Sequence, residues 1–294
     1  MTREAGLLPQ QDADRQPGAA TRLARPAKAP RGVVNSLWAH RELVWQLTRR
    51  EVLGRYRGSL FGVAWAVGNP LLMLAVYTLV FGYIFRARWG AGVDTTGEFA
   101  LVLFCGLTVF GIFSEVVSRA PSLILSNPSY VKKVVFPIDC LPWVLLGAAL
   151  FHAAASLAVL LLANAVLRGV VPWTAVLLPI VLLPLLLLAL GLAWLLAALG
   201  VYLRDIGHLV NALLTVLLFL SPVFFPASSL PEPIHRLIML NPLTAVLESA
   251  RAVLLWGQQP DWLLLLPSTV ASALVAWLGW LWFDRTRTGF ADVL

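Results

Sequence analysis

Two ionisable residues lie inside apolar stretches of the sequence, where a charge is costly and is therefore a candidate for function. They are Glu115 and His152. A chain of such groups can relay protons, but Glu115 precedes Arg119 by four residues, which is the spacing of a helical ion pair. His152 is the only ionisable residue of its own stretch. We therefore expect one ion pair and one isolated histidine that is satisfied or lies in a small pocket, with a proton relay as the alternative.

The sequence lacks the motifs of an intramembrane hydrolase or of an ATPase. It has no HExxH or GxSxG motif, and no lysine follows a glycine as a phosphate-binding loop requires. Cys105 and Cys140 lack the spacing of a metal site, and we expect both to be buried. We predict no catalytic residue, metal or cofactor in this chain. If it drives uphill transport, ATP and magnesium bind a partner subunit.

Four arginines gather just before the first apolar stretch: Arg49, Arg50, Arg55 and Arg57. The planar fork of arginine binds phosphate oxygens, so these residues could receive the phosphate or pyrophosphate of a lipid. They could equally anchor the chain to anionic headgroups, at about 1 kcal/mol each. Arg55 and Arg57 lie nearest the span, and Gly58 and Gly62 have the GxxxG spacing that permits close backbone approach.

These residues belong to a chain with the composition of a polytopic membrane protein. Of its 294 residues, 59% are hydrophobic and 13% are charged, and the mean hydropathy is +0.81. A soluble domain of this length does not reach these values. The net charge of +7 lies mainly outside the apolar stretches, so we interpret it as membrane topology and not as a nucleic-acid surface.

Six stretches are long and apolar enough to cross a bilayer as helices. They are Leu60–Phe85, Phe99–Val117, Leu141–Leu167, Trp173–Leu203, Leu209–Phe225 and Trp262–Phe283. An even number places both termini on one side. The other side holds only Arg86, Arg88, Arg168, Arg236 and Arg251 among the basic residues. The positive-inside rule then makes the side of the termini cytoplasmic.

The region before the first span divides in two. Residues 1–33 are rich in proline and lack the apolar run of a signal peptide, so we expect a disordered cytoplasmic tail. Residues 34–58 predict an amphipathic helix, with an apolar stripe at Leu37, Trp38, Val44, Trp45 and Val52. Such a helix suits the headgroup plane, with the tryptophans as anchors. Packing on a soluble partner is the alternative.

The loop after the second span predicts a short basic helix. Asn127 suits its cap and Pro128 its first position, and Phe136-Pro137 ends it. With Lys132 and Lys133 it fits a cleft on a partner, although a solvated connector is the alternative.

Before the last span, residues 231–258 are apolar but broken at Asn241-Pro242. They predict two short helices that enter the outer leaflet and return, with a surface hairpin as the alternative.

In order and spacing, several segments resemble the membrane subunit of type-2 ABC exporters for polysaccharides. They are RYRGSLFGVAWAVGNP at 55–70, LILSNPSYVKKVVFP at 123–137, YLRDIGHLVNALL and SPVFFP within 202–226, LNPLTAVLESAR at 240–251 and the terminal FADVL. The resemblance covers about residues 36–294. It implies an all-α, six-span domain over residues 59–284 and a cytoplasmic C-terminal tail over 285–294. It also implies a homodimer with two ATP-binding subunits that exports lipid-linked O-antigen, teichoic acid or related glycans across the cytoplasmic membrane.

The resemblance also implies roles for particular residues. It makes Ser126–Lys133 the coupling helix, Asn35–Arg57 the interfacial helix and Pro231–Trp256 the re-entrant pair. The residues expected at the ATPase subunit are Ser126, Asn127, Pro128, Tyr130, Lys132 and Lys133. The candidates for a conduit or gate are Trp65, Tyr77, Glu248 and Arg251.

Two rival functions remain open from the sequence. An ABC exporter of drugs or small lipids shares the six-span plan. A membrane-embedded enzyme that modifies lipids or glycans is the rival from another class, and substitution of Glu115 or His152 should abolish turnover only in such an enzyme. The 12 Trp, 14 Phe and 5 Tyr residues suit sugar stacking and interfacial belts equally well.

Overall fold

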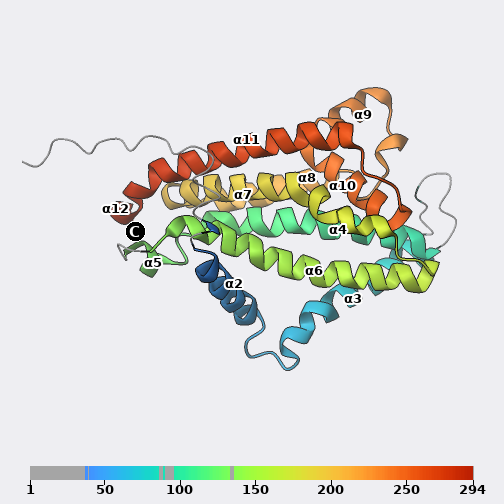
Figure 1. The fold of residues 1–294 in the computed structure, drawn as a ribbon, viewed down its shortest axis with the longest axis horizontal. Coiled ribbons are helices and arrows are strands. Elements are labelled where there is room, and N and C mark those ends of the chain that lie inside the picture. Colours follow the sequence, from blue (N-terminus) through green and yellow to red (C-terminus); the bar gives the residue numbers. More distant parts are fainter. Residues whose placement is uncertain (1–36, 39, 86–88, 90–95, 133–135, 294) are drawn as a thin grey trace, which may run out of the picture.

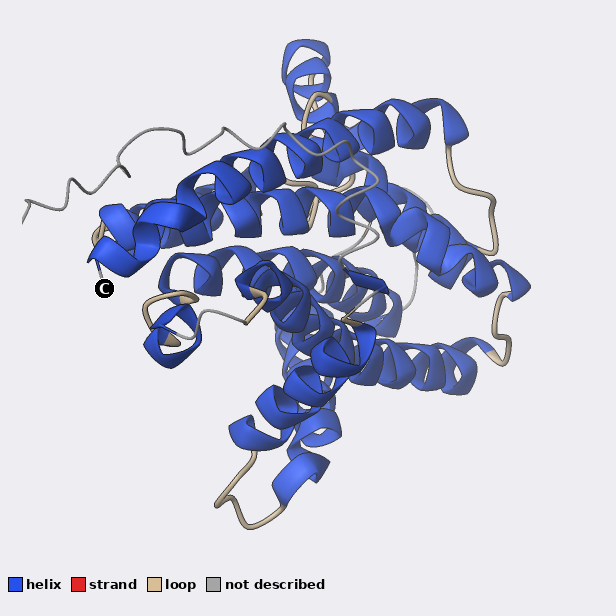
Figure 2. Ribbon diagram, turned by 60° about the vertical axis from the view of Figure 1, so that its left-hand side comes forward, coloured by secondary structure: helices blue, strands red, loops and turns tan. Residues whose placement is uncertain are grey.

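A computed structural model of the chain describes residues 37–38, 40–85, 89, 96–132 and 136–293, and within them every regular element is a helix (Figure 2). The predicted tail 1–33, the start of the predicted interfacial helix and Lys133 lie outside the described residues. The α-helices are α2 (Arg41–Arg55), α3 (Trp65–Tyr77), α4 (Thr96–Arg119), α5 (Pro128–Lys132), α6 (Leu141–Arg168), α7 (Leu178–Tyr202), α8 (Ile206–Leu220), α9 (Glu232–Met239), α10 (Pro242–Arg251), α11 (Trp262–Thr286) and α12 (Phe290–Val293). Short 3-10 and π segments join them, including the π segments Thr78–Ile84 and Ala252–Trp256.

Within the described residues, five continuous helical segments have the length and hydropathy of membrane spans. They are Gly62–Ile84, Gly97–Ser122, Ile138–Arg168, Trp173–Tyr202 and Trp262–Gly289. Each coincides with one of the predicted spans. Helices α4, α6, α7 and α11 run lengthwise through the molecule (Figure 1). The predicted class, an all-α polytopic membrane protein, is confirmed.

The fifth predicted span is shorter as a helix than we expected. Helix α8 has 15 residues, about 22 Å at the helical rise, against ~30 Å of hydrocarbon. It ends where Ser221 adopts an extended conformation, because a residue followed by proline disfavours the helical region. Residues 221–226 continue as turns and bends. Inside a membrane, the carbonyl groups of such a segment need partners from the protein.

The segment before the last span consists of two short helices, as the sequence predicts. Helix α9 and the helix Pro242–Trp256 meet at an angle of 94°, which is the geometry of a broken span or a re-entrant loop. The first helix ends at Met239, and Asn241 caps the start of the second. Its side-chain oxygen accepts a hydrogen bond from the backbone N–H of Leu243, and Pro242 takes the first helical position.

Helices α7 and α11 approach each other closely through glycine. A Cβ atom on Gly191 would lie 2.6 Å from the backbone nitrogen of Ala276, and one on Gly279 would lie 2.1 Å from the carbonyl oxygen of Gly191. Small residues at a contact between membrane helices let the backbones come this near, which increases van der Waals contact. The pair therefore forms a tightly packed wall of the bundle.

Helices α2 and α3 diverge from the bundle and form a V below it (Figure 1). Gly58 and Gly62 have φ values of 86° and 52°, so the reversal between the two helices uses a backbone region that favours glycine. Only 6% of the most apolar window of the α3 span is buried within the chain, against 78% for the α4 span. Helix α3 therefore leaves a large apolar surface for lipid or protein.

Helix α2 packs against α6 and buries only Thr48 and Val52 among its own residues. Thr48 is buried there, and a Cβ atom on Gly147 would lie 3.0 Å from its side chain. Trp38 and Trp45 are 70% and 69% exposed. Exposed tryptophans on a membrane-proximal helix suit the headgroup region, so the predicted interfacial position of α2 is physically reasonable.

The C-terminal residues pack back against the bundle. Phe290 of α12 is fully buried and meets Phe283 edge to face at 5.5 Å. The Tyr202 hydroxyl donates a hydrogen bond to the carbonyl of Thr286. Helices α12 and α5 lie at the same end of the molecule (Figure 1). The predicted C-terminal tail therefore lies beside the predicted docking helix.

The contact between α7 and α11 yields a test of the packing. Gly279→Ala should lower the free energy of unfolding by about 1 to 3 kcal/mol, because the added methyl group overlaps the Gly191 carbonyl. Gly111→Ala is the matched control, since a Cβ atom there meets nothing within 4 Å. Thermal unfolding in detergent measures both. Equal melting temperatures for the two variants would contradict the close packing.

Candidate functional site

Two adjoining cavities lie where α2, α3, α4 and α6 meet. The charged cavity, of about 830 Å³, is lined by Arg50, Glu51, Arg55, Glu115, Arg119 and His152, among others. The aromatic cavity, of about 310 Å³, is lined largely by apolar and aromatic groups that include Trp65, Met73, Tyr77, Phe104 and Ile112. The two cavities share Arg55, Gly111, Glu115 and His152. The charged cavity thus continues into the aromatic cavity.

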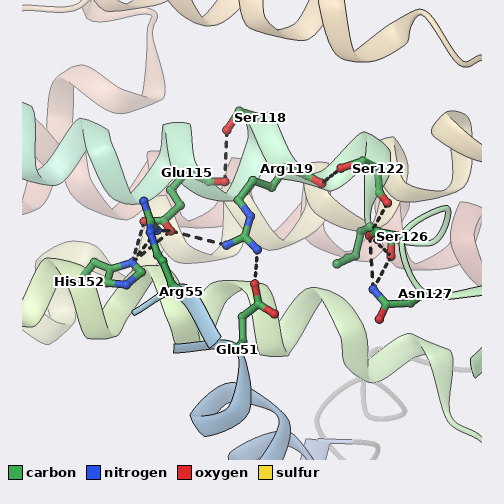
Figure 3. Close-up of polar contacts among 10 residues, drawn as sticks. Glu51, Arg55, Glu115, Ser118, Arg119, Ser122, Ser126, Asn127 and His152 are labelled. Carbon is green, nitrogen blue, oxygen red and sulfur yellow. Dashed lines mark hydrogen bonds and ion pairs between the residues drawn. The ribbon is translucent and has the colours of Figure 1, made fainter. Parts of the chain in front are cut away.

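The carboxylate of Glu115 is the centre of a polar cluster at the boundary between these cavities (Figure 3). Its Oε1 accepts a hydrogen bond from Nη1 of Arg55 at 2.5 Å. The Nδ1 atom of His152 lies 3.1 Å from the same oxygen and 3.1 Å from the Arg55 Nη1. Nη1 of Arg119 is 3.7 Å away. Residues from α2, α4 and α6 therefore meet at one carboxylate.

This cluster confirms one expectation and corrects another. The predicted pair between Glu115 and Arg119, four residues apart, is present. The expectation that His152 stands alone is wrong, because it contacts both Glu115 and Arg55. Arg55 is 60 residues from Glu115 and 97 from His152. No local spacing in the sequence signals a contact over such separations.

A second polar connection joins α2 to the predicted docking segment. Arg50 donates a hydrogen bond from Nη2 to the Tyr130 hydroxyl at 2.5 Å. The next residue of α2, Glu51, pairs with Arg119 of α4. A third cavity of about 290 Å³ lies along this connection and is lined in part by Arg50, Ser126, Asn127 and Tyr130. The docking segment is therefore linked through α2 to the cluster around Glu115.

The predicted docking helix is present but short. Helix α5 begins at Pro128, directly after Asn127, and ends at Lys132. Two side-chain hydrogen bonds hold the turn before α5. The Asn127 amide donates to the Leu123 carbonyl at 2.9 Å, and the Ser126 hydroxyl donates to the Ser122 carbonyl at 2.8 Å (Figure 3). Tyr130 stacks on Phe136 with ring centroids 4.3 Å apart. These hydrogen bonds and the ring stacking thus hold the segment in one conformation.

The four predicted phosphate-binding arginines divide into two groups. Arg50 and Arg55 line the charged cavity, whereas Arg49 and Arg57 are exposed and line none of these three cavities. Tyr56, beside Arg55, meets His152 edge to face at 6.0 Å. Burial raises the pKa of the Tyr56 phenol above its ordinary value, so it stays a neutral group. Geometry therefore favours Arg55 over Arg57 as a cavity residue.

At the other end of the bundle, Arg251 is fully buried. Its guanidinium donates hydrogen bonds to the carbonyls of Pro222 at 2.6 Å, Val223 at 3.0 Å and Val102 at 3.4 Å. It also pairs with Glu248 at 3.2 Å. The carbonyls of residues 222 and 223 belong to the non-helical segment after α8. Arg251 therefore supplies the partners that this segment needs inside a membrane.

The remaining surroundings of Arg251 fit its guanidinium closely. The ring of Trp89 lies 4.4 Å from the guanidinium carbon, which is a cation–π contact. A Cβ atom on Gly106 would lie 2.5 Å from Nη2. In this structure Arg251 donates hydrogen bonds to backbone carbonyls and lines none of the cavities described above. No local pattern signals this role, because Arg251 falls on the polar side of the helix that the sequence predicts.

The four candidates for a conduit or gate therefore occupy different places. Trp65 and Tyr77 both line the aromatic cavity. Glu248 is partly exposed and lines a fourth cavity of about 300 Å³. Arg251 lies enclosed beneath it. A gating role for any of the four stays a prediction.

The described residues contain no group of three His, Cys, Asp or Glu side chains placed to hold a metal ion. Both cysteines are buried, as expected. The chemistry of the cavities is therefore that of cationic and aromatic side chains. Cationic and aromatic side chains in adjoining cavities suit the binding of an anionic amphiphile.

Five apolar helices long enough to cross a membrane, together with a bent helix pair, define a polytopic membrane protein. The chain belongs to the ABC-2 type transporter family, whose model matches residues 42–255. It is thus a transport subunit and not an enzyme, and ATP hydrolysis takes place on a separate subunit.

Three relatives are similar along most of their length. The chain is 31% identical over 262 residues to the O-antigen export system permease protein RfbA of Myxococcus xanthus, covering 88% of this chain and 98% of the relative. It is 22% identical to RfbA of Klebsiella pneumoniae, covering 86% and 95%. It is 25% identical to the polysialic acid transport protein KpsM of Escherichia coli, covering 71% and 79%.

The enclosed arginine yields a stability prediction. Arg251→Met should destabilise the protein by about 3 kcal/mol, because it leaves carbonyls of the segment after α8 without partners. Arg251→Lys should recover only part of this, since one ammonium group cannot reach the same spread of carbonyls. Arg236→Met is the control, since Arg236 is exposed and pairs only with Glu232 among the contacts described. Thermal unfolding in detergent compares the three, and a neutral Arg251→Met would contradict the bracing role.

Proposed function

We propose that this chain is the permease subunit of an ATP-driven transporter that exports a lipid-linked polysaccharide across the cytoplasmic membrane. The observation that carries the proposal is the charged cavity continuing into the aromatic cavity. Such a site suits a molecule with a phosphate head and an apolar or sugar-bearing body. The names of the similar proteins, which mention O-antigen and polysialic acid, support a glycan as the cargo.

The proposed orientation places both termini in the cytoplasm. Helices α5 and α12 lie at one end of the molecule (Figure 1), and Arg50 of α2, which extends below the bundle, contacts Tyr130 of α5. The N-terminal region together with the loop of α5 carries most of the basic residues. The positive-inside rule supports a cytoplasmic location for that end. The re-entrant pair would then face the outer leaflet.

The proposed assembly is a homodimer with two ATP-binding subunits. Helix α3 supports the dimer, because little of its apolar surface is buried within one chain. Trp65 and Tyr77 of α3 line the aromatic cavity, so a second copy on the α3 surface would lie beside this cavity. Interfaces between obligate partners are large and apolar, and the α3 surface has this character.

Export of a small lipid or drug is the second candidate. The apolar lining of the aromatic cavity, which includes Met73 and Ile112, favours it. The two candidates differ in what stimulates the ATPase of the assembled transporter. A polyprenyl-linked glycan should stimulate it if the proposal is right, and a small lipid without sugar should stimulate it equally under the alternative.

Coupling through Ser126–Lys133 can be tested by charge reversal. Lys132→Glu with Lys133→Glu should detach or uncouple the ATPase subunit, while the membrane bundle stays folded. Each rim charge contributes about 1 kcal/mol or less, so single changes should show little. Co-purification of the subunit and export in cells measure the effect, with Arg236→Glu at the opposite end as control. Normal assembly and export by the double variant would refute the coupling role.

Phosphate recognition by arginine can be separated from simple anchoring. Arg55→Lys keeps the charge but loses the fork, so export should fall clearly if Arg55 binds phosphate. Arg57→Lys is the matched control, because Arg57 lies outside the cavities described here. Export of glycan is compared at equal amounts of inserted protein. Near-normal export by Arg55→Lys would leave only the anchoring role.

A further inference from the structure

The side chain that Arg55 contacts in this structure is itself an anion. The Glu115 carboxylate takes the hydrogen bond from Arg55 at 2.5 Å, at the boundary between the charged and the aromatic cavity. A phosphate that contacted Arg55 from either cavity would lie beside this carboxylate. We propose that Glu115 is a displaceable counter-ion that competes with the phosphate of the substrate for Arg55. This inference rests on the proposed function and concerns the same site.

The ion pair between Arg55 and Glu115 is partly exposed, so another anion can replace the carboxylate. Its arginine side chain is 54% exposed and its carboxylate 19% exposed, and such a partly hydrated pair is weak. A phosphate group carries more charge and more acceptor oxygens than a carboxylate, and arginine contacts it through two parallel hydrogen bonds. An incoming phosphate can therefore replace the carboxylate at Arg55.

The displaced carboxylate has another partner within reach. Arg119 lies one turn further along α4, with Nη1 already 3.7 Å from Glu115. It also pairs with Glu51 of α2. Glu115 can turn from Arg55 to Arg119 without entering an apolar environment, so the exchange leaves no unpaired charge in the membrane.

His152 can remain hydrogen-bonded in both states. Its Nδ1 atom is 3.1 Å from Glu115 and 3.1 Å from Arg55, so it can donate to the carboxylate in one tautomer and accept from the guanidinium in the other. Its Nε2 atom is buried and has no hydrogen-bond partner among the described residues. In the tautomer whose Nδ1 accepts from Arg55, this nitrogen carries the ring proton and has no acceptor among the described residues. His152 would serve as a positioning residue for whichever anion Arg55 holds.

The ligand chemistry is a phosphate or pyrophosphate group, and its source is tested directly. The permease is assembled with its ATPase subunit in phosphatidylcholine nanodiscs. The rate of ATP hydrolysis is titrated with a polyprenyl pyrophosphate, with inorganic pyrophosphate and with phosphatidylglycerol. Stimulation by the polyprenyl pyrophosphate at the lowest concentration identifies a lipid-linked phosphate as the ligand. Equal potency of the inorganic ion or of phosphatidylglycerol assigns the site to free phosphate or to ordinary headgroups.

Competition is tested by the direction in which Glu115→Gln changes the half-maximal concentration of the polyprenyl pyrophosphate. Removing the internal anion should lower the half-maximal concentration of the polyprenyl pyrophosphate about two- to fivefold, which is the competition expected from a partly exposed ion pair. Glu232→Gln, which removes an exposed carboxylate paired with Arg236 at the other end, should leave it unchanged. A purely structural Glu115 would instead raise the value on substitution. Glu115→Asp, which keeps the charge on a shorter side chain, should give a smaller decrease and serves if Glu115→Gln does not assemble.

The outcomes separate this inference from the function on which it rests. If the unmodified transporter does not respond to any of the three phosphates, phosphate recognition at Arg55 is wrong, and the competition fails with it. If the unmodified transporter responds but Glu115→Gln matches Glu232→Gln or binds more weakly, only the competition is overturned.

Discussion

The need to satisfy backbone polar groups inside a membrane governs this fold. Lipid offers no hydrogen bonds, so any segment that leaves the helical conformation must find partners in the protein. The chain leaves it after α8, and in the π segment Ala252–Trp256 it departs from the α-helical hydrogen-bond pattern. Side chains supply partners for carbonyl groups at both places. Arg251 binds the carbonyls of Pro222 and Val223. Arg168 and Thr174 bind those of Leu255 and Val253. The re-entrant pair is therefore held by buried polar contacts as well as by its buried apolar residues.

The two ends of the bundle consequently differ in rigidity. At the end with the re-entrant pair, Arg251 is enclosed, and Gly106 leaves no room beyond it. At the end with the charged cavity, only Thr48 and Val52 of α2 are buried, and its ion pairs with α4 are partly hydrated. Elements with few buried contacts and exposed polar pairs open at low free-energy cost. Conformational change in a transport cycle is thus expected to begin at α2 and α3, and to reach the re-entrant pair only through the packed helices.

Much of this architecture follows from local patterns in the sequence. Hydropathy and length identify five spans, and Asn-Pro pairs mark the starts of α5 and α10, because these signals act over a few residues. Contacts between distant residues leave no such pattern. The meeting of Arg55, Glu115 and His152 depends on how three helices pack, and the burial of Arg251 depends on where α8 stops. The length of α8 itself was misjudged, since apolar residues continue past Ser221 although the helix does not.

The polar contacts around α2 form a physical path between the docking segment and the cavity. Tyr130 of α5 contacts Arg50, and the adjacent Glu51 pairs with Arg119. Arg119 in turn lies beside Glu115, which holds Arg55. Continuity alone does not establish coupling, which requires an element with two arrangements that both sites bias. Helix α2 can be that element, because Arg50 and Glu51 connect it to α5 and α4 while Arg55 connects it to the cavity. A shift of α5 on a partner would then change the position of Arg55, and a phosphate at Arg55 would, by the same linkage, change the position of α5.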